Sequence, residues 1–268
     1  PCPPIMSAST TFCPYGTVPS ARGRGPPRRF DDVVAEARSL VEAGYKDITL
    51  LGQNVNSYGR DLDEGRDFAD LIRAINDIPG DFLIRFMTSH PRDATEKLFR
   101  TMAECEKCAK HIHLPVQSGS NRILKAMNRH YGREKYLEEV RTARELMPDI
   151  VLTTDIIVGF PGETRSDFDE TLSLVREVGY DAMFTFIFSP REGTPAAKLP
   201  DPVSREEKQV WFDELVELSN SISGEKHTAY AGKTLRVLVD GETGRDGYNI
   251  SARTNGGRLV HLKGGAEL

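Results

Sequence analysis

Hydrophobic positions along most of the chain follow two alternating spacings. In residues 31–44, apolar side chains such as Val33, Ala37 and Leu40 recur at helical intervals, which predicts a helix that stops at Gly44. Short β-branched runs follow such helices, and each predicts a buried strand. The predicted strands are residues 46–52, 82–87, 111–116, 151–159 and 182–188. Because a helical pattern separates each strand from the next, we expect an α/β fold, a partial parallel (β/α) TIM-like barrel.

The pattern changes towards the end of the chain. Residues 204–230 predict one long helix with Ser204 at its N-cap. From Gly232, apolar and polar positions alternate between glycine turns, which is typical of antiparallel strands. We therefore divide the chain into a core domain, residues 1–227, and a small all-β unit, residues 228–268. A further strand is expected near the start, around Ile5 and Met6.

Composition limits the class of protein. The chain has 268 residues, 38% hydrophobic and 28% charged, so it can bury a substantial core. No apolar run approaches the roughly 18 to 20 residues of a membrane span, and the start lacks a signal-peptide pattern, which predicts a cytoplasmic protein. The four cysteines are too few for a secreted disulfide framework. The net charge of −5 argues against a broadly basic nucleic-acid binder, although residues 228–268 carry +2.

Polar, glycine-containing segments follow all five predicted strands. They are "GQN" at residues 52–54, "TSH" at 88–90, "QSGS" at 117–120, "GFPGET" at 159–164 and "SPREGT" at 189–194. The carboxyl ends of parallel strands in a barrel converge on one mouth, so we expect a ligand there among Gln53, Ser89, Gln117, Gly159 and Arg191. Taken alone, each segment could be an ordinary turn. All five together favour a site.

Other polar side chains have both a structural and a functional interpretation. Asp155 lies inside an apolar strand, where a carboxylate needs either a structural partner or a polar mouth. His111 and His113 alternate along one strand, but no carboxylate or cysteine at a matching spacing supports a metal site. Cys105 and Cys108 form C-x2-C without a second pair or a histidine motif, which favours an ordinary pair of thiols.

Five segments resemble the radical S-adenosylmethionine (SAM) methylthiotransferases, in particular the MiaB group. They are "LLGQNVNSYG" (50–59), "HIHLPVQSGSNRILKAMNRHYGREKY" (111–136), "TTDIIVGFPGET" (153–164), "FSPREGTPAA" (188–197) and "LVHLKG" (259–264). The resemblance implies a partial barrel of the radical SAM type and a truncated TRAM-like domain, a small, incomplete β-barrel that binds RNA. It also implies transfer of a methylthio group to C2 of N6-isopentenyladenosine in tRNA.

The resemblance implies two cofactors, SAM and a [4Fe–4S] cluster. The residues that it places around SAM are Gln53, Asn54, Ser89, Gln117, Ser118, Asp155, Gly159 and Arg191. Gly162 would let the backbone approach the adenine. The guanidinium of Arg191 suits either the SAM carboxylate or a substrate phosphate. Arg22 and Arg24 would contact tRNA phosphates, the alternative being an exposed basic loop.

The expected cluster loop lacks two of its three cysteines. "IMSASTTFCPYGTVPSARGR" (5–24) resembles the family's loop, in which three thiolates at C-x3-C-x2-C spacing hold the cluster. Cys13 occupies the second position, but Ser9 and Gly16 stand at the first and third. A serine oxygen is a poor substitute for a thiolate, and glycine has no side chain. We therefore expect no stable cluster and no reductive cleavage of SAM.

Three functional hypotheses follow. The first is a tRNA methylthiotransferase homologue, impaired by the lost cysteines and expected to be a fragment, because the family's sulfur-donating domain does not precede the core here. The second is a cluster-less relative that binds SAM or RNA, or a relative of the ribosomal-protein methylthiotransferases. The third, a metabolic barrel enzyme, is disfavoured by the coincidence of five segments. We expect tRNA as partner, no membrane association and a monomer; the sequence identifies no catalytic residue.

Overall fold

The computed structural model describes residues 1–6, 15, 28–60, 62 and 65–265. Its α-helices are α2 (Phe30–Glu42), α3 (Phe68–Asn76), α4 (Glu96–Glu104), α5 (Asn121–Ala126), α6 (Arg133–Leu146), α7 (Arg165–Val178) and α8 (Arg205–Thr228). Its strands are β1 (Asp47–Leu50), β2 (Leu83–Phe86), β3 (His111–His113), β4 (Val151–Val158), β5 (Ala182–Ile187), β6 (Val237–Glu242), β7 (Ile250–Thr254) and β8 (Leu259–Leu262). Short 3-10 helices span Val55–Ser57, Pro91–Asp93 and Pro195–Lys198. The expected alternation of strands and helices is confirmed.

The first five strands form a parallel series in two sheets. β1 pairs with β2, and β4 lies between β3 and β5, with every pair parallel. The two sheets meet where Ile84 of β2 makes a parallel bridge with Cys108, just before β3. β3 is shorter than the expected strand because Pro115 cannot donate to a ladder, although Leu114 N still bonds Thr153 O at 2.8 Å. The parallel order predicted from the helical crossovers is confirmed.

The start of the chain runs beside β1. Pro4 makes a parallel bridge with Leu51, and Ile5 N donates to Leu51 O at 2.8 Å. The extended segment expected around Ile5 therefore exists. It forms a single bridge rather than a full strand, because the prolines of residues 1–4 have no N–H to donate to a ladder.

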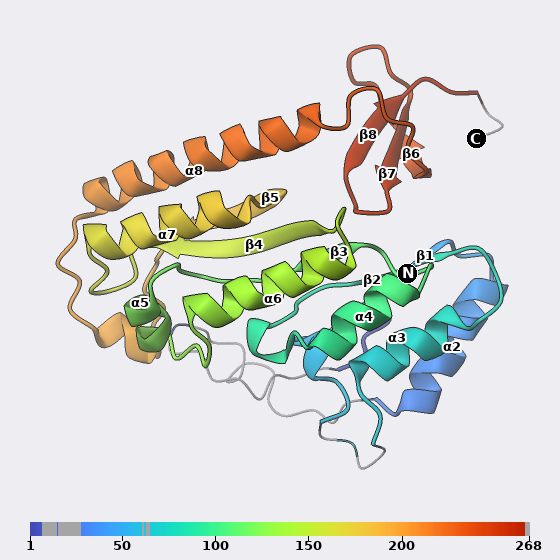
Figure 1. The fold of residues 1–268 in the computed structure, drawn as a ribbon, viewed down its shortest axis with the longest axis horizontal. Helices are drawn as coiled ribbons and strands as arrows, with labels where there is room; N and C mark the ends of the chain where they lie inside the picture. The colour runs from blue at the N-terminus through green and yellow to red at the C-terminus, as the bar shows by residue number, and fades with distance from the viewer. Residues whose placement is uncertain (7–14, 16–27, 61, 63–64, 266–268) are drawn as a thin grey trace.

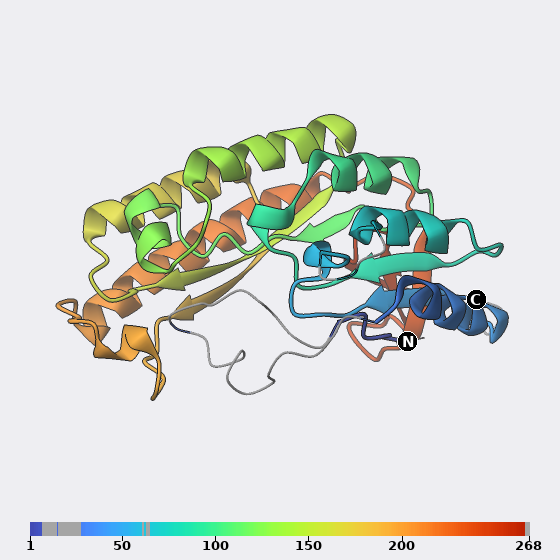
Figure 2. The same ribbon diagram turned by 90° about the horizontal axis from the view of Figure 1, so that it is seen from below.

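The helices form an outer layer on one side of this sheet. Neighbouring helices pack in the order α2, α3, α4, α6, α7 and α8, and α8 also lies along β5 (Figures 1 and 2). Trp211 of α8 stacks on Phe168 of α7 at 5.4 Å between ring centroids. Ser204 caps α8 as expected, accepting from Glu207 N at 3.1 Å. Gly44 follows α2 with φ of 89°, the left-handed conformation predicted from the sequence.

Alternate residues of β4 and β5 face opposite sides of the sheet. Ile156 and Val158 are fully buried beneath the helices. Asp155 and Ile157 face the other side, the concave interior, together with their register partners on β5, Phe184 and Phe186. Residues 182, 184 and 186 of β5 are exposed on this interior face. The interior face is therefore more open than the outer face, which the helices cover.

A separate antiparallel sheet, in the order β6, β7, β8, lies beyond the amino end of β4 (Figure 1). Gly256, in the turn between β7 and β8, comes so close to Val151 that an added Cβ would lie 2.4 Å from its Cγ2. Asn255 Oδ1 accepts from Lys110 N at 2.8 Å, and Asn255 O accepts from Arg85 at 2.8 Å. The antiparallel strands expected from the alternating pattern are present. Their identification as TRAM-like remains a prediction.

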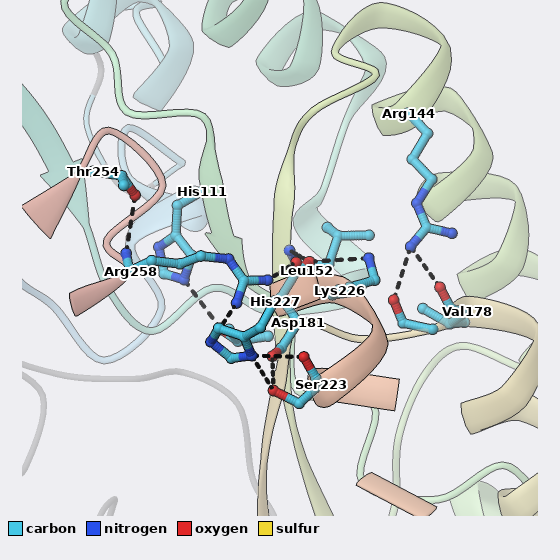
Figure 3. A network of polar contacts seen from close by, with 12 residues as sticks. His111, Arg144, Leu152, Val178, Asp181, Ser223, Lys226, His227, Thr254 and Arg258 are labelled. Carbon is cyan, nitrogen blue, oxygen red and sulfur yellow. Dashed lines mark hydrogen bonds and ion pairs between the residues drawn. The ribbon is translucent and has the colours of Figure 1, made fainter. Parts of the chain in front are cut away.

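Asp181, just before β5, joins this sheet to the barrel (Figure 3). Its carboxylate accepts from Leu152 N at 2.9 Å and pairs with Arg258 and, at 3.4 Å, with Lys226. Arg258 also contacts His227 Nε2 at 3.0 Å. The side chains of Asp181 and Arg258 are only 8% and 10% exposed, so their ion pair is largely shielded from water.

Candidate functional site

The polar segments predicted to form a mouth follow the strands as expected. Gln53 and Asn54 come after β1, Ser89 after β2, and Gln117 makes a bridge to Ile156 of β4. The two neighbouring loops from β4 and β5 carry Gly159 and Arg191. Because these strands are parallel, all of these loops leave the same edge of the sheet.

Two non-glycine residues at this edge have a left-handed backbone. Thr88 has φ of 70° and Gln117 has φ of 72°. Each is held by backbone hydrogen bonds: Val55 N donates to Thr88 O at 3.0 Å, and Gln117 N donates to Asp155 O at 2.9 Å. Such conformations are unfavourable for residues with a Cβ and cluster at ligand sites, where they aim a side chain. The Gln117 side chain is thus presented by a backbone shape that the sequence did not predict.

Two buried oxygen atoms at the mouth have no hydrogen-bond partner among the described residues. They are Oδ1 of Asn54 and Oγ of Ser89, whose residues are 4% and 5% exposed. The Asn54 amide is fixed from its other side, because Nδ2 donates to Asp93 Oδ2 at 2.6 Å. An unpaired buried polar atom costs about 1–3 kcal/mol. Both oxygens can accept hydrogen bonds, so they suit a ligand that donates them.

Asp93 is the buried charge that orients Asn54. Burial alone would raise its pKa, but hydrogen bonds from Arg92 and Asn54 lower the pKa below the usual value. Arg60 adds an ion pair at 2.6 Å. The carboxylate therefore stays ionised and keeps the Asn54 amide turned with Oδ1 away from it.

His90 belongs to the same buried group and was not predicted from the sequence. Its Nδ1 accepts from Arg92 N at 3.2 Å, so the ring proton lies on Nε2, which has no partner in the part of the chain that the structure describes. Burial, with nearby Arg129, lowers the pKa of His90 to about 3, and the ring is neutral. The sequence feature that could have indicated His90 is its position directly after Ser89, in the segment 88–90 that was predicted to lie at the mouth.

Ser118 faces away from the mouth. Its Oγ lies 3.4 Å from Thr171 Oγ1 of α7 and accepts from Ser120 N at 3.2 Å, and the residue is fully buried. Gly119 allows this close packing, since an added Cβ would lie 2.5 Å from Thr171 Cα. The Ser118 hydroxyl thus ties the loop to α7, and the structure does not bring it together with the other predicted residues.

Asp155 has both the partner and the open face that its sequence context left as alternatives. Its Oδ1 lies 3.4 Å from His113 Nε2, and its side chain is 28% exposed towards the interior. His113 Nδ1 and His111 Nε2 both contact Thr153 Oγ1, at 3.0 and 3.2 Å. Burial lowers the pKa of His111 to about 4. His113 thus contacts the Asp155 carboxylate, and Thr153 links His113 to His111.

The loop after β4 carries the predicted Gly159. Its φ is 73°, and its N–H donates to the Glu163 carboxylate, which closes the turn. Burial raises the pKa of Glu163 to about 7. An added Cβ on Gly159 would lie 2.4 Å from Lys208 Cδ of α8, so this position is tightly covered. Arg191, by contrast, is exposed.

Tyr15 links the N-terminal segment to the mouth. Its hydroxyl accepts from Arg129 Nη2 at 2.6 Å, and its ring meets Phe160 edge-on at 6.0 Å between centroids. Tyr15 stands two positions after Cys13. Cys13 itself lies outside the described residues, as do Ser9, Gly16, Arg22 and Arg24.

The sequence model of the Radical SAM superfamily matches residues 9–175 of this chain. The chain belongs to the radical SAM superfamily. Among curated relatives, the tRNA-2-methylthio-N(6)-dimethylallyladenosine synthase of Clostridium botulinum (strain Hall) is 52% identical over 97% of the chain and 58% of that protein. The synthase of that name from Thermoanaerobacter sp. (strain X514) is 50% identical, over 98% of the chain and 56% of that protein. The chain thus spans less than two thirds of these relatives.

Solved radical SAM enzymes share the fold. The methyltransferase TsrM from Kitasatospora setae aligns with a TM-score of 0.60 at 19% identity, covering 73% of this chain and 38% of that protein. Coproporphyrinogen III oxidase (HemN) from Escherichia coli aligns with a TM-score of 0.59 at 16% identity, covering 82% and 52%. The partial parallel barrel expected from the sequence is confirmed. No helix among the described residues is long and apolar enough to cross a membrane.

Two of the three other cysteines of this radical SAM chain, Cys105 and Cys108, lie away from the mouth, while Cys2 is exposed at the start of the chain. Cys105 and Cys108 are buried between α4 and the amino end of β3. Burial raises both thiol pKa values, that of Cys108 to about 12. Within the described residues, no group of three or more His, Cys, Asp or Glu side chains could hold a metal ion. These two thiols are protonated and unreactive at neutral pH.

Proposed function

We propose that this chain is the core of a tRNA methylthiotransferase homologue that binds SAM at the mouth of the barrel. The observation that carries the proposal is the 52% identity, along 97% of the chain, to an enzyme named for 2-methylthio-N(6)-dimethylallyladenosine synthesis. The corresponding reaction transfers a methylthio group to C2 of N6-isopentenyladenosine in tRNA. The chain acts as a monomer in the cytoplasm, where tRNA is found.

The residues at the mouth fit SAM. Its ammonium group donates hydrogen bonds, and the unpaired oxygens of Asn54 and Ser89 accept them. Gln117, in the loop after β3, makes a bridge beside Asp155 of β4, and the two offer an amide and an acceptor carboxylate to the ribose hydroxyls. The guanidinium of Arg191 is exposed and suits a carboxylate. Gln53 and the backbone at Gly159 complete the rim.

When bound, SAM would supply the radical chemistry of the reaction. The residues of the chain hold SAM and exclude water. They do not fit the [4Fe–4S] cluster that delivers the electron in this family, because Cys13 is the one thiol at a ligand position of the resembling loop. Cys105 and Cys108 cannot make up the set, since both are buried near the other end of β3.

The lost cysteines favour a second candidate function, that of a cluster-less relative that binds SAM or RNA without radical chemistry. In both cases residues 228–268 form a TRAM-like RNA-binding domain, and residues 1–227 form the core. The end of α8 at Thr228 and the antiparallel strands that follow support this division. The ribosomal-protein alternative is less well supported, because the relatives named above carry the name of the tRNA enzyme.

Titration calorimetry with SAM tests the cofactor site without any need for turnover. The parent chain should bind SAM. Asn54→Ala should weaken binding about tenfold or more, because it removes a hydrogen bond to the charged ammonium group worth about 1.5 kcal/mol or more. Gln117→Ala should weaken binding about two- to tenfold, because a hydrogen bond to a neutral hydroxyl contributes about 0.5–1.5 kcal/mol. Gln209→Ala on the exposed surface of α8 is the control and should bind as the parent does. A folded parent that does not bind SAM would overturn the proposed site.

A further inference from the structure

Two phenylalanines of β5 are exposed inside the barrel. Phe184 is 54% exposed and Phe186 is 52% exposed, and both face the interior beside their register partners Asp155 and Ile157. The opposite face of β5 packs on the core through Met183. Phenylalanine is usually buried, so two adjacent exposed rings on a concave face indicate a surface that another molecule covers.

An aromatic wall continues from these rings to the mouth. Phe188 follows on the chain, is buried, and meets Phe160 at 5.3 Å between ring centroids. Phe160 in turn meets Tyr15 at 6.0 Å. Phe184 and Phe186 therefore form the inner part of a wall whose outer part contacts Tyr15, which stands two positions after Cys13. A molecule that covers them lies directly below the proposed SAM site.

Below the wall lies a cavity whose lining combines apolar and charged side chains. Ala182, one step below Phe184 on the same face, lines a cavity of about 430 Å³. Met87, directly after β2, and Leu259 of β8 also line this cavity, and they are 42% and 49% exposed. The charged side chains of the lining already have partners, since Arg85 pairs with Asp47 and Arg258 with Asp181. Beside the wall, the ring of His113 lies edge-on to Phe184 at 5.8 Å and bonds Thr153. This space suits an apolar group better than a charged one.

We propose that Phe184 and Phe186 receive the alkyl group on N6 of the substrate adenine and so make the enzyme select alkylated over unmodified adenosine. The inference rests on the proposed function, and it assigns substrate selection to two side chains that the SAM site does not use. The flat rings contact the alkyl group and the edge of the base, while the small Ala182 leaves room for the end of the chain. Removing the rings removes apolar contact without breaking any ladder hydrogen bond of β5.

Direct binding of two RNA hairpins tests this inference without turnover. The hairpins have one sequence and differ only in the central base, adenosine or N6-isopentenyladenosine. By fluorescence anisotropy, the parent should prefer the alkylated hairpin about tenfold, as expected when roughly two methylene groups are buried. Phe184→Ala/Phe186→Ala should reduce the preference to less than about twofold. Phe184→Leu/Phe186→Leu, which keeps apolar bulk, should retain most of it.

Val210→Ala is the matched control, because Val210 is 63% exposed on α8, outside the barrel. It should keep the parent's preference. Thermal unfolding of each variant checks folding, and the leucine pair tests the inference if the alanine pair unfolds. Suppose that the parent prefers the alkylated hairpin and that the alanine pair folds and keeps the full preference. This result would overturn the inference and leave the proposed function standing. A parent that binds both hairpins equally would also overturn it, whereas a parent that binds neither would overturn the RNA substrate of the proposed function as well.

Discussion

The two ends of the parallel sheet differ in how their polar groups are paired. Near the amino end of β5, the Asp181 carboxylate has three partners. The Arg258 guanidinium also has partners, except at Nε, which has none in the described part of the chain. At the carboxyl end, buried atoms of Asn54 and Ser89 lack partners within the described ranges. The first arrangement joins two parts of one chain, while the second leaves acceptors that the proposed SAM site would use. Buried polar groups thus indicate a binding site where they are unpaired and an internal interface where they are paired.

The largest expected effect concerns binding of the [4Fe–4S] cluster. Ser9→Cys with Gly16→Cys should raise iron content from near zero to about four atoms per chain after anaerobic reconstitution, because three thiolates then have the family's spacing. The double variant should form 5′-deoxyadenosine from SAM under dithionite, whereas either single variant, with two thiolates, should recover little. Iron analysis and chromatography of the products are the measurements. About four iron atoms and product from the parent itself would contradict the claim that the two lost cysteines matter.

The next effect concerns the paired end. Asp181→Asn leaves Arg258 and Lys226 without their shared carboxylate, and breaking such a buried pair should lower the free energy of unfolding by about 3–5 kcal/mol. Urea denaturation measures it. Asp81→Asn is the control, because the Asp81–Arg236 pair is 72% and 83% exposed and should contribute about 0–1 kcal/mol. Equal losses in the two variants would show that the Asp181 network does not join the C-terminal sheet to the barrel as described.

A pH experiment separates the neutral histidine at the mouth from the charged pairs. The folded pKa of His90 is about 3, below the ordinary 6.5, so between these values the unfolded chain binds a proton that the folded chain does not. Stability from this group is complete above pH 6.5 and is lost as the pH falls. His90→Gln should therefore flatten the dependence of unfolding free energy on pH between about 4 and 6.5, by at most about 1.4 kcal/mol per pH unit.

The exposed His130 provides the control for this pH series. His130→Gln should leave the slope as in the parent, and taking the difference between parent and variant removes the contributions of other titrating groups such as Glu163. An unchanged slope in His90→Gln would mean that the imidazole at the mouth can accept a proton in the folded chain.

The smallest expected effect distinguishes binding from stability at the mouth. Ser89→Ala removes an unpaired buried hydroxyl, so the free energy of unfolding should stay the same or rise by up to about 1 kcal/mol. The affinity for SAM should nevertheless fall, because an acceptor for the cofactor is lost. Denaturation and calorimetry on one preparation measure both quantities. A clear loss of stability would instead show that the Ser89 hydroxyl makes a stabilising hydrogen bond in the folded chain.

The sequence by itself determined the order and direction of the strands. Helical runs between short β-branched runs leave only parallel pairing by crossover, so the loops with Gln53, Ser89, Gln117 and Arg191 had to share one edge of the sheet. The antiparallel strands after Gly232 followed in the same way from a period of two. These features depend on local spacing, which any reader of the chain can count.

The tertiary structure alone decided which side chains are paired and which remain unpaired. Ser118 stands between two mouth residues in the sequence, yet Thr171 of α7 holds it outwards, while His90 is left with an unpaired Nε2 among the described residues. Asp181 stands in no motif, and its partners come from positions 226 and 258, on elements far along the chain. Phe184 and Phe186 belong to a strand that the sequence predicts as buried, and they are exposed because the interior face of the barrel is left open by the helix layer. Local pattern fixes which way a strand runs, whereas the satisfaction of a polar group or the burial of a ring depends on atoms brought close only by folding.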